Sequence, residues 1–586
     1  MSIQARKTGL ARAMLLADVA GRLGPRALAL YGWHRAQRAA GLPLRRLAPA
    51  AGVTVPPGVL GSAPLPAAPA LPPEAIESLR VAMAALPPAA WHGPFAAEAP
   101  ALLLDLFRPG DVRLVWEANR LTWLPLLVQA ARLWPEQGHR AAAEARLAAW
   151  CAANPPFQGP NWACGQEAAL RVLHLALALL LAGAAADPPG PARAFLRLHA
   201  RRIAATGTYA QAQDNNHSIS EPAGLLACGW LLGEPALARR AAAALSGALR
   251  RLVAPDGGFA QVSTGYHRLL LDTLAVVELL RRHLGRPPLP APFADRAAAA
   301  AHWLARLVAA DGALPALGHQ DGSAFADLAL GGPADARGSA ERAMRLFAGA
   351  SAGFAGEPGC LWLDLPDLPP APRPAAWVAS GTRGWEVAGA RALLRTGPLR
   401  FRPGQADLLH FELWDGSRPV LTDAGTGAYN PPAAQAWWLD YFPTARAHNT
   451  ILFDEREPMP RLSRFLLARW PRLRPLPQGA ALRDANGNHH RREVTQEGRT
   501  WTVTDTVGGR FRHLALRWRL GPGDWRLTPD GVEGPARLRL EADASLALAL
   551  ESGWESPAYG QVRPCPVLVA RAAAPVSRIV TRVLLP

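Results

Sequence analysis

The sequence predicts a helical domain followed by an antiparallel β-sandwich. Apolar residues recur at helical spacing up to about residue 350 of the 586-residue chain. After the Pro-rich segment 365–374, apolar and polar residues alternate instead, as they do in strands. Because a chain of this length exceeds what one hydrophobic core usually organises, we expect several domains. These are a basic N-terminal segment and linker at 1–75, a helical domain at 76–365 and a sandwich at 375–586.

The individual elements follow from these periods and from the turn residues between them. Helices are predicted at 112–134, 165–181, 191–206, 221–232, 235–253 and 265–284, and the Pro, Gly and Asp residues between them are typical of paired helices. Strands are predicted at 537–540 and 577–585, with turns at Asp415-Gly416 and Asn486-Gly487. No sequence repeat of fixed period is found, so a solenoid is not supported, whereas a ring of helical hairpins stays open.

The composition is that of a globular protein with a strong basic bias. The formal net charge is +17, which suits a polyanionic partner. The competing explanation is a coding bias towards arginine, because Lys7 is the only lysine among 63 basic residues. No zinc-finger spacing, RNA-binding aromatic motif or short basic recognition segment is present, so nucleic-acid binding is not expected. The five cysteines lack CxxC spacing and are expected to be buried thiols.

The N-terminal segment is basic and only partly apolar. Its apolar stretch 10–30 is interrupted by the charged residues Arg12, Asp18, Arg22 and Arg26. These charges argue against a signal peptide and a membrane span, and both cytoplasm and periplasm stay open as the location. The segment through Arg46 is able to form a basic amphipathic helix on an anionic membrane surface. We favour the alternative, a solvated helix packed on the body of the protein.

Three polar clusters are candidates for chemistry, and the first occupies residues 214–222. Asp214 or Asn215 is able to cap the following helix, but a cap explains only one residue of the cluster. If the helix starts near Asn216, His217 and Glu221 lie one turn apart, so the carboxylate is able to fix the imidazole tautomer.

The second cluster spans residues 256–268 and the third is divided over the β half. In the second, Tyr266, His267 and Arg268 either cover a core or supply a general acid, a base and a charged clamp. The third cluster contains Gln405, His410, Asp423 and His448. Polar residues between strands normally face water, yet these two histidines and the aspartate are able to converge on zinc or on substrate.

Six short motifs occur in one order along residues 110–455. They are 115–121, 160–162 with Glu167 and Arg171, Asn216-His217, 263–267, 423–426 and 447–450. Because the motifs occur in the order found in the heparinase II/III family of polysaccharide lyases, the chain resembles that family. The resemblance implies an incomplete (α/α) toroid followed by a β-sandwich. It also implies β-elimination on a uronate-containing acidic polysaccharide, which is the partner we expect.

The resemblance implies roles for individual residues. Asn216 with His217 is expected to bind the C5 carboxylate of the uronate, and Tyr266 to protonate the leaving oxygen or take the proton. Further contacts with substrate are expected from Arg120, Trp162, Glu221, His267, Arg268, Gln405, Tyr441 and His448. The base stays open among His217, Tyr266, Tyr429, Tyr441 and His410.

The resemblance is incomplete where relatives hold zinc. Their three ligands correspond to Gln405, Asp423 and His448, and glutamine is a poor zinc ligand. A further histidine of the relatives corresponds to Pro403. If the stretch from Gln405 is a strand, His410 faces the opposite way and does not replace the missing ligand. We therefore expect no cofactor, with Asp423 and His448 as the weak candidates for zinc.

Two other functions are compatible with the same scaffold. One is a non-lytic or biosynthetic protein that binds or processes an exopolysaccharide. The other is a glycoside hydrolase, which requires two carboxylates flanking the scissile bond, available from Glu167, Glu221 and Asp256. An unsaturated, ultraviolet-absorbing product distinguishes a lyase from both.

Overall fold

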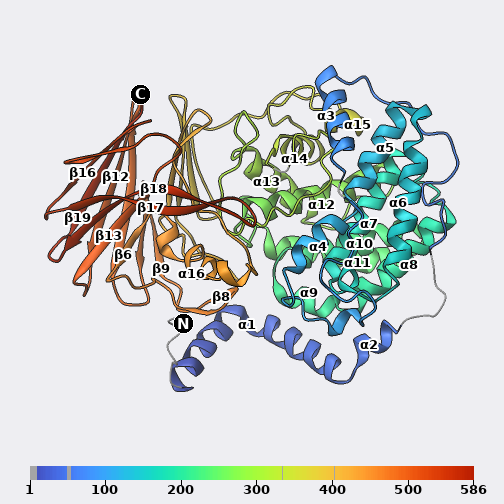
Figure 1. Cartoon of the computed structure of the whole chain (residues 1–586), viewed down its shortest axis with the longest axis horizontal. Helices are drawn as coiled ribbons and strands as arrows, with labels where there is room; N and C mark the ends of the chain where they lie inside the picture. Colours follow the sequence, from blue (N-terminus) through green and yellow to red (C-terminus); the bar gives the residue numbers. More distant parts are fainter. Residues whose placement is uncertain (1–8, 49–54, 87, 333, 402) are drawn as a thin grey trace.

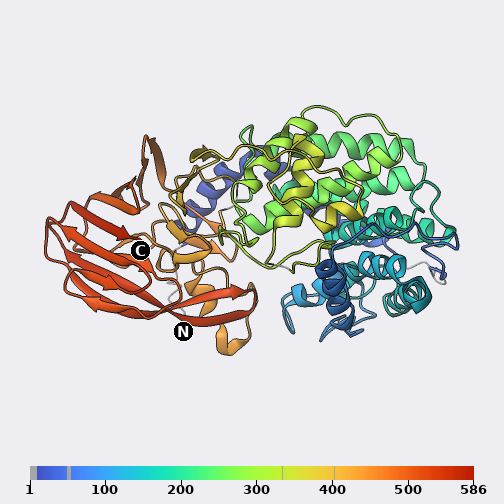
Figure 2. The same cartoon turned by 90° about the horizontal axis from the view of Figure 1, so that it is seen from above.

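The computed structural model describes residues 9–48, 55–86, 88–332, 334–401 and 403–586. Lys7 and residues 49–54 of the expected linker lie outside the described residues. Figure 1 shows the helices and the strands as two bodies side by side, and the view from above in Figure 2 shows the same separation. The last helix of the helical body ends at Trp362 and the first strand begins at Ala376, so the predicted order of helices before strands is confirmed.

The helical body forms an incomplete (α/α) toroid of paired helices. The pairs α5/α6, α7/α8, α10/α11 and α12/α13 are in contact. The helices of the whole chain are α1 (Gly9–Ala39), α2 (Leu42–Arg46), α3 (Pro73–Ala84), α4 (Val112–Asn119), α5 (Trp123–Leu133), α6 (His139–Ala153), α7 (Gly165–Leu181), α8 (Gly190–Ala205), α9 (Gly207–Gln213), α10 (His217–Leu231), α11 (Pro235–Leu252), α12 (Thr264–His283), α13 (Phe293–Ala305), α14 (Arg337–Ala343), α15 (Pro358–Trp362) and, in the β half, α16 (Trp438–Tyr441).

Helix α7 lies at the centre of this body. It contacts α5, α8, α10 and α12, and nearly all of its side chains are buried. A helix that is apolar around its whole circumference is stable only when neighbours cover every face. The apolar composition of 165–181 therefore places α7 inside the ring and leaves the ends of α10 and α12 to form its mouth.

The β half consists of antiparallel sheets. Their strand orders are β1-β2-β3-β4-β5, β14-β15-β16-β19-β12-β11-β10-β9, β17-β18-β13-β6 and β7-β8. The strands are β1 (Ala376–Ala379), β2 (Thr382–Val387), β3 (Ala390–Arg395), β4 (Phe411–Asp415), β5 (Arg418–Leu421), β6 (Ile451–Phe453), β7 (Arg461–Ser463), β8 (Leu466–Leu467), β9 (Arg472–Leu476), β10 (Gly479–Arg483), β11 (His489–Glu497), β12 (Thr500–Gly508), β13 (His513–Arg519), β14 (Arg526–Thr528), β15 (Gly531–Glu533), β16 (Arg537–Ala542), β17 (Ala547–Ala558), β18 (Gln561–Ala573) and β19 (Arg578–Leu584).

One apolar core holds the sheets together. It contains Phe411 of β4, Trp501 of β12, Trp518 of β13 and Leu568 of β18, so the three larger sheets all contribute. Along β12 buried and less buried residues alternate, because successive side chains of a strand point to opposite faces. The alternation seen in the sequence is therefore the packing of one face on this core.

Two helix boundaries differ from the sequence prediction. The predicted helix 112–134 is two helices, because Leu121 adopts a φ of 63°, which lies in the left-handed region and interrupts the helix. Helix α10 begins at His217, four residues before the predicted start, and it contains Pro222. Pro222 has no N–H, so the helix lacks the bond that this position would otherwise donate to the carbonyl of Ser218.

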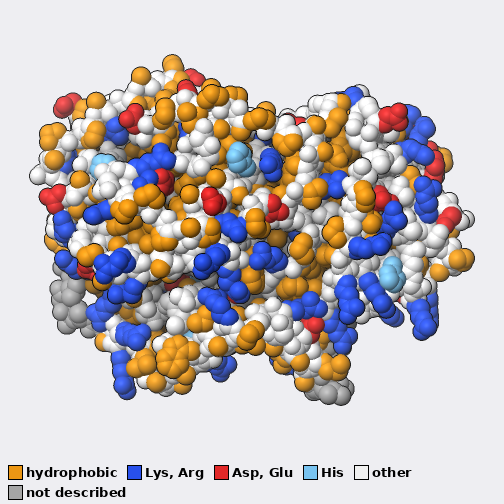
Figure 3. All heavy atoms as spheres, turned by 180° about the vertical axis from the view of Figure 1, so that it is seen from behind, with side chains coloured by type: hydrophobic (Ala, Val, Ile, Leu, Met, Phe, Trp, Pro, Cys, Tyr) orange, Lys and Arg blue, Asp and Glu red, His pale blue; other side chains and the backbone are white. Residues whose placement is uncertain are grey.

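Helix α1 runs along one edge of both bodies (Figure 1). Leu15 and Val19 pack on Ala468 of the β half, while the His34 ring stacks on Tyr209 of α9 at 4.8 Å. The lower edge in Figure 3 carries hydrophobic side chains among basic ones. Trp33 of α1 is one of the exposed large hydrophobic residues. No described helix is long and apolar enough to cross a membrane. Contact of α1 with a membrane surface stays a prediction.

The described part of the expected linker, 55–72, contains no helix or strand but lies on the helical body. The Glu144 carboxylate of α6 accepts hydrogen bonds from the N–H groups of Gly58 and Val59, both at 2.9 Å. Arg140 donates to the carbonyl of Ala63 at 2.7 Å. These contacts fasten the segment to α6 rather than leaving it as a free connection.

Candidate active site

A cleft of about 1000 Å³ lies where the mouth of the helical ring meets the β half. Its helical wall includes Asn216, His217 and Tyr266, and its β wall includes Tyr429 and Phe465. Helix α1 contributes a third side through residues such as Arg35 and Arg38. The cleft therefore brings together side chains from three regions that are distant in the sequence.

Tyr266 lies in the first turn of α12 and points into this cleft. Ser263 caps the helix, because its hydroxyl accepts a hydrogen bond from the N–H of Tyr266 at 3.1 Å. The Tyr266 hydroxyl donates to Oδ2 of Asp321 at 2.8 Å and lies 3.4 Å from the hydroxyl of Tyr429. Burial, reinforced by the negative charge of Asp321, raises the pKa of Tyr266 well above its ordinary value. The phenol is thus a proton donor at neutral pH.

Two arginines and three carboxylates form a chain beside Tyr266. Arg113 lies 3.2 Å from Oδ2 of Asp321 and 3.0 Å from Glu117. Arg120 binds Glu117 at 2.6 Å and makes two bonds of 2.8 Å to Glu167. Burial alone raises the pKa of a carboxyl, but the partners of Asp321, led by Arg113, and those of Glu167, led by Arg120, together outweigh it, so both pKa values are lowered. Asp321 and Glu167 are therefore ionised in the folded protein.

A group of side-chain amides lies at the start of α10. Just before that helix, the Asn215 side chain accepts the N–H of His217 at 3.1 Å, while the side chain of Asn216, the cap residue, makes other contacts. Asn216 donates its amide to Oε1 of Gln166 at 2.8 Å, and its backbone N–H donates to Oε1 of Gln261 at 3.0 Å. Because the oxygens of both glutamines accept bonds, their NH₂ groups are left as donors for a ligand. His217 Nδ1 lies 3.2 Å from Glu221, one turn along the helix.

Of the residues expected to bind substrate, Arg120 and Glu221 line the cleft, whereas His267, Arg268 and Trp162 are buried outside it. His267 donates its Nε2–H to the carbonyl of Ala300 at 2.9 Å and stacks on Trp303. Successive residues of a helix differ by about 100° in direction, so a helix that presents Tyr266 to the cleft turns its neighbours into the core.

Trp162 and Arg268 have structural partners of the same kind. The Trp162 indole donates to the carbonyl of Asn154 at 3.1 Å, and Arg268 donates to the Ser339 hydroxyl at 2.8 Å. Tyr441 of the β half also lies outside the cleft, where its hydroxyl accepts from Arg519 at 2.9 Å. Among the described residues, Trp162, Arg268 and Tyr441 are not part of the cleft wall.

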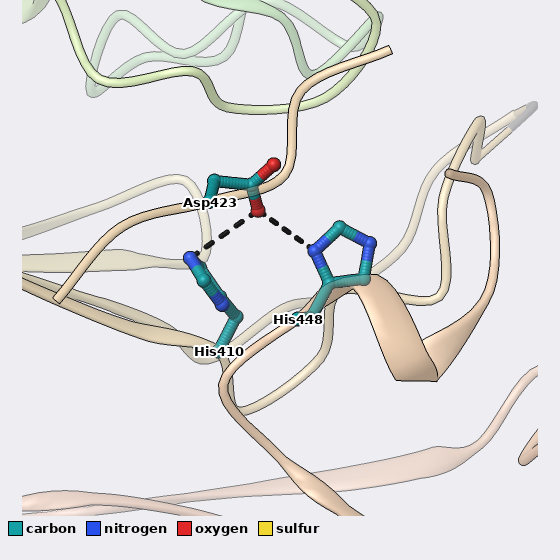
Figure 4. A group of neighbouring side chains, drawn as sticks. All are labelled: His410, Asp423 and His448. Atoms are coloured by element: carbon teal, nitrogen blue, oxygen red, sulfur yellow. Dashed lines mark hydrogen bonds and ion pairs between the residues drawn. The ribbon is translucent and has the colours of Figure 1, made fainter. Parts of the chain in front are cut away.

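His410, Asp423 and His448 converge in the β half, as Figure 4 shows. His448 Nδ1 lies 2.7 Å and His410 Nε2 lies 3.3 Å from Oδ2 of Asp423. All three side chains are buried and none lines the cleft. The pKa of Asp423 is lowered: burial alone raises it, but the two imidazoles outweigh burial. The cluster is therefore separate from Tyr266 and its neighbours.

Hydrogen bonding around His410 argues against a metal at this cluster. Its Nδ1 accepts the backbone N–H of Asn449 at 2.7 Å, so the neutral ring carries its proton on Nε2, the atom that faces Asp423. A metal-bound imidazole instead offers a lone pair to the ion and keeps its proton on the other nitrogen. The described donor set thus does not fit zinc in this arrangement. The expectation of no metal stays a prediction.

The segment that carries Gln405 and His410 is a loop and not the strand that the sequence suggested. Residues 403–410 are not a strand, because β4 begins at Phe411 and Leu409 adopts a φ of 60°. Alternation of side chains between two faces does not apply to such a loop. Gln405 is buried and donates its amide to the carbonyl of Gly425 at 2.9 Å, outside the main cleft.

The cleft residues that were missed in the sequence include Arg113, His319 and Asp321. His319 and Asp321 lie in the loop between α13 and α14, where no periodic pattern surrounds them. The readable signal was a turn, since Gly318 and Gly322 flank the pair with φ values of 64° and 70°. For Arg113 the signal was Glu117, four residues ahead on the same helix face.

Comparisons with known proteins agree with this architecture. Heparinase III is similar with a TM-score of 0.62 and 14% identity, over 95% of this chain and 91% of that one. A second heparinase III structure has a TM-score of 0.59 and 16% identity, over 99% and 93%. A heparan sulfate lyase from Pedobacter heparinus has a TM-score of 0.54 and 16% identity, over 94% and 90%. No curated protein matches the sequence.

The toroid, the sandwich and the cleft between them define a protein with the fold of these polysaccharide lyases. Residues 369–579 match the family model described as heparinase II/III-like, C-terminal. The resemblance to the heparinase II/III-like family that the six motifs indicate is therefore confirmed.

Proposed function

We propose that the protein is a polysaccharide lyase that cleaves a uronate-containing acidic polysaccharide by β-elimination. One observation carries the proposal: the hydroxyl of Tyr266, which is held as a proton donor by Asp321, shares a cleft with the amides around Asn216. An elimination needs both kinds of group. Amide donors stabilise the charge that develops on the substrate carboxylate, and an acid protonates the departing oxygen.

The proposed reaction divides these tasks between the two ends of the cleft. Asn216 and the free NH₂ groups of Gln166 and Gln261 bind the C5 carboxylate, which makes the C5 proton more acidic. A base removes that proton, the C4–O bond breaks, and Tyr266 protonates the oxygen. Loss of one such donor typically costs a factor of about 10²–10³ in rate, and loss of acid–base transfer about 10²–10⁴.

The charges around the cleft support an acidic substrate. Arg35 and Arg38 line it from α1 and make no ion pair within the described chain. The acidic groups of the cleft are instead engaged with partners, as Asp214 is with Arg251 at 2.6 Å. Figure 3 shows basic side chains spread over one face of the molecule with fewer acidic ones. A polyanion is therefore attracted both to the surface and to the cleft.

The hydrolase alternative has weaker support. A hydrolase needs one carboxyl group that is protonated to act as the acid. Glu167 is held ionised by Arg120, and Asp256 lies outside the cleft wall, where it accepts the N–H of Ser380 at 2.7 Å. Glu221 alone does not make the required pair.

The test is a screen of purified protein against heparan sulfate, hyaluronan and alginate. Heparan sulfate comes first because a structurally similar protein is a heparan sulfate lyase. Absorbance of the unsaturated uronate and reducing ends are measured in parallel, with Tyr266→Phe as the control. A lyase produces both signals. Reducing ends without absorbance indicate a hydrolase, and binding without either signal indicates a non-lytic protein.

A further inference from the structure

His319 lies in the cleft between Tyr266 and the β half, on the loop that joins α13 to α14. The ring is partly buried and meets the Tyr429 ring edge to face, with centroids 5.2 Å apart, and the Phe465 ring at 6.0 Å. The same cleft wall contains Tyr266. Tyr429, which touches both, lies 3.4 Å from the Tyr266 hydroxyl, so imidazole and phenol face one space.

Hydrogen bonds of the backbone hold His319 close to Tyr266. The Ser263 hydroxyl that caps the Tyr266 N–H donates to the carbonyl of His319 at 2.6 Å. On the other side, the N–H of Gln320 donates to Thr426 of the β half at 2.7 Å. A single serine thus connects the two residues, and the loop is fastened to both walls of the cleft.

The ring of His319 packs directly on the backbone of Gly404. A Cβ built at Gly404 lies only 2.5 Å from Cε1 of His319, so any side chain there has to displace the ring. The neighbouring Pro403 has no titratable group. The β wall of the cleft therefore offers a surface shaped for an imidazole that comes from the helical half.

The other groups near Tyr266 are unsuited to remove a proton from carbon. Burial raises the pKa of both Tyr266 and Tyr429, so the phenols stay protonated. The Asp321 carboxylate already accepts Tyr266 and the N–H of Ser323 and pairs with Arg113. These partners occupy its oxygens, so the carboxylate is not open to a C–H group of the substrate.

His319 is suited to that task by its position beside Tyr429 and Tyr266. Its ring is neutral at pH 7, since burial lowers its pKa to about 4. The charged groups that face it are Asp321 on its own loop and Asp407 on the β half, and both act to raise the pKa. A neutral imidazole has a lone pair available for a proton.

We propose that His319 is the base that removes the C5 proton of the uronate while Tyr266 acts as the acid; this rests on the proposed lyase function. The imidazole lone pair forms an N–H bond and the C5–H bond breaks. The electron pair of the C5–H bond becomes the C4=C5 double bond. The electron pair of the C4–O bond leaves with the oxygen, and this oxygen takes the proton of Tyr266. Proton transfer from the imidazolium to the phenolate, through Tyr429 or solvent, restores the starting state.

The experiment compares His319→Gln, His319→Ala and His217→Gln on heparan sulfate, hyaluronan and alginate. His513→Gln, an exposed histidine of the β half, is the matched control. We expect kcat of both His319 variants to fall by about 10²–10⁴, with KM nearly unchanged and circular dichroism unaltered. Added imidazole is expected to restore part of the rate of His319→Ala only. Gly404→Ala, which keeps the imidazole but displaces it, is expected to slow turnover as well.

The outcomes test the assignment of His319 as the base separately from the proposed lyase function. If the parent protein yields unsaturated product and His319→Gln retains its kcat, the base assignment is overturned while the lyase stands. A loss confined to His217→Gln assigns the base to His217 instead. If the parent protein yields no unsaturated product from any of the three polysaccharides, the proposed function fails, and the base fails with it.

Discussion

Tyr266 and Asp321, fifty-five residues apart, are joined by a hydrogen bond of 2.8 Å from the phenol to Oδ2. The same carboxylate oxygen lies 3.2 Å from Arg113. The Asp321 carboxylate thereby orients the phenol, and it forms an ion pair with Arg113. The orientation of the Tyr266 phenol thus depends on the loop between α13 and α14 as much as on the helix that carries it.

Changing Tyr266 to Phe is expected to lower kcat by about 10²–10⁴ while KM stays nearly the same. The substitution removes the transferable proton but leaves the ring that packs in the cleft wall. Steady-state kinetics on the polysaccharide found in the screen measure both constants. Tyr441→Phe is the matched control, because it removes a phenol hydroxyl outside the cleft and should keep its kcat. Equal activity of Tyr266→Phe and the parent protein contradicts the assignment.

Asp321→Asn is expected to destabilise the fold and to reduce activity. Removing one partner of a buried ion pair leaves Arg113 without full compensation, which typically costs about 3 kcal/mol or more. Urea unfolding at pH 7 measures the loss. Asp187→Asn, whose exposed carboxylate pairs with Arg193, should change the free energy of unfolding by less than about 1 kcal/mol. Equal losses in the two variants refute the expectation.

Asn216→Ala is expected to weaken both binding and turnover, in contrast to Tyr266→Phe. The amide is proposed to contact the carboxylate in the bound substrate and more strongly in the transition state, so KM rises and kcat falls by about 10²–10³. Asn486→Ala, in the turn between β10 and β11, serves as control. A variant that loses only stability, with unchanged constants, shows that Asn216 is structural.

Protein purified without chelator is expected to contain no stoichiometric zinc. The reason is the proton that His410 carries on Nε2 when Nδ1 accepts from Asn449. Elemental analysis and the change in Tm on adding zinc or EDTA measure binding. Gln405→His supplies the ligand that relatives are implied to have and should raise zinc content. Stoichiometric zinc in the parent protein that disappears in His410→Ala shows that the ring is a ligand after all.

The free energy of unfolding is expected to fall between pH 6.5 and pH 4.5, partly through His267. Burial lowers the pKa of His267 from 6.5 to about 4 in the folded protein. The unfolded chain therefore binds the proton first, and stability is lost as the pH falls below 6.5, by about 1.4 kcal/mol per pH unit for one such group. His267→Gln should flatten the dependence by that amount in urea unfolding. An identical pH slope in both proteins contradicts this.

Much of the site was readable from local chemistry. Asn216, His217, Glu221 and Tyr266 stood out because polar residues follow a turn and open an apolar helix, and the cleft contains all four. His267 and Arg268, beside Tyr266 in the same cluster, lie in the core instead. Membership of a polar cluster does not give the direction of a side chain, which depends on how the helix is rotated against its neighbours.

The sequence by itself determined the two kinds of secondary structure and their order, because hydrophobic periods of 3.6 and 2 are local properties of the chain. It also indicated a helix at 165–181, whose burial as α7 appears in the structure. Only the tertiary structure decided that His319 and Asp321 stand beside Tyr266, and that His410 reaches Asp423 from a loop. These contacts join residues on different turns of the chain, several of them with left-handed backbone, and no local pattern records where two such turns meet.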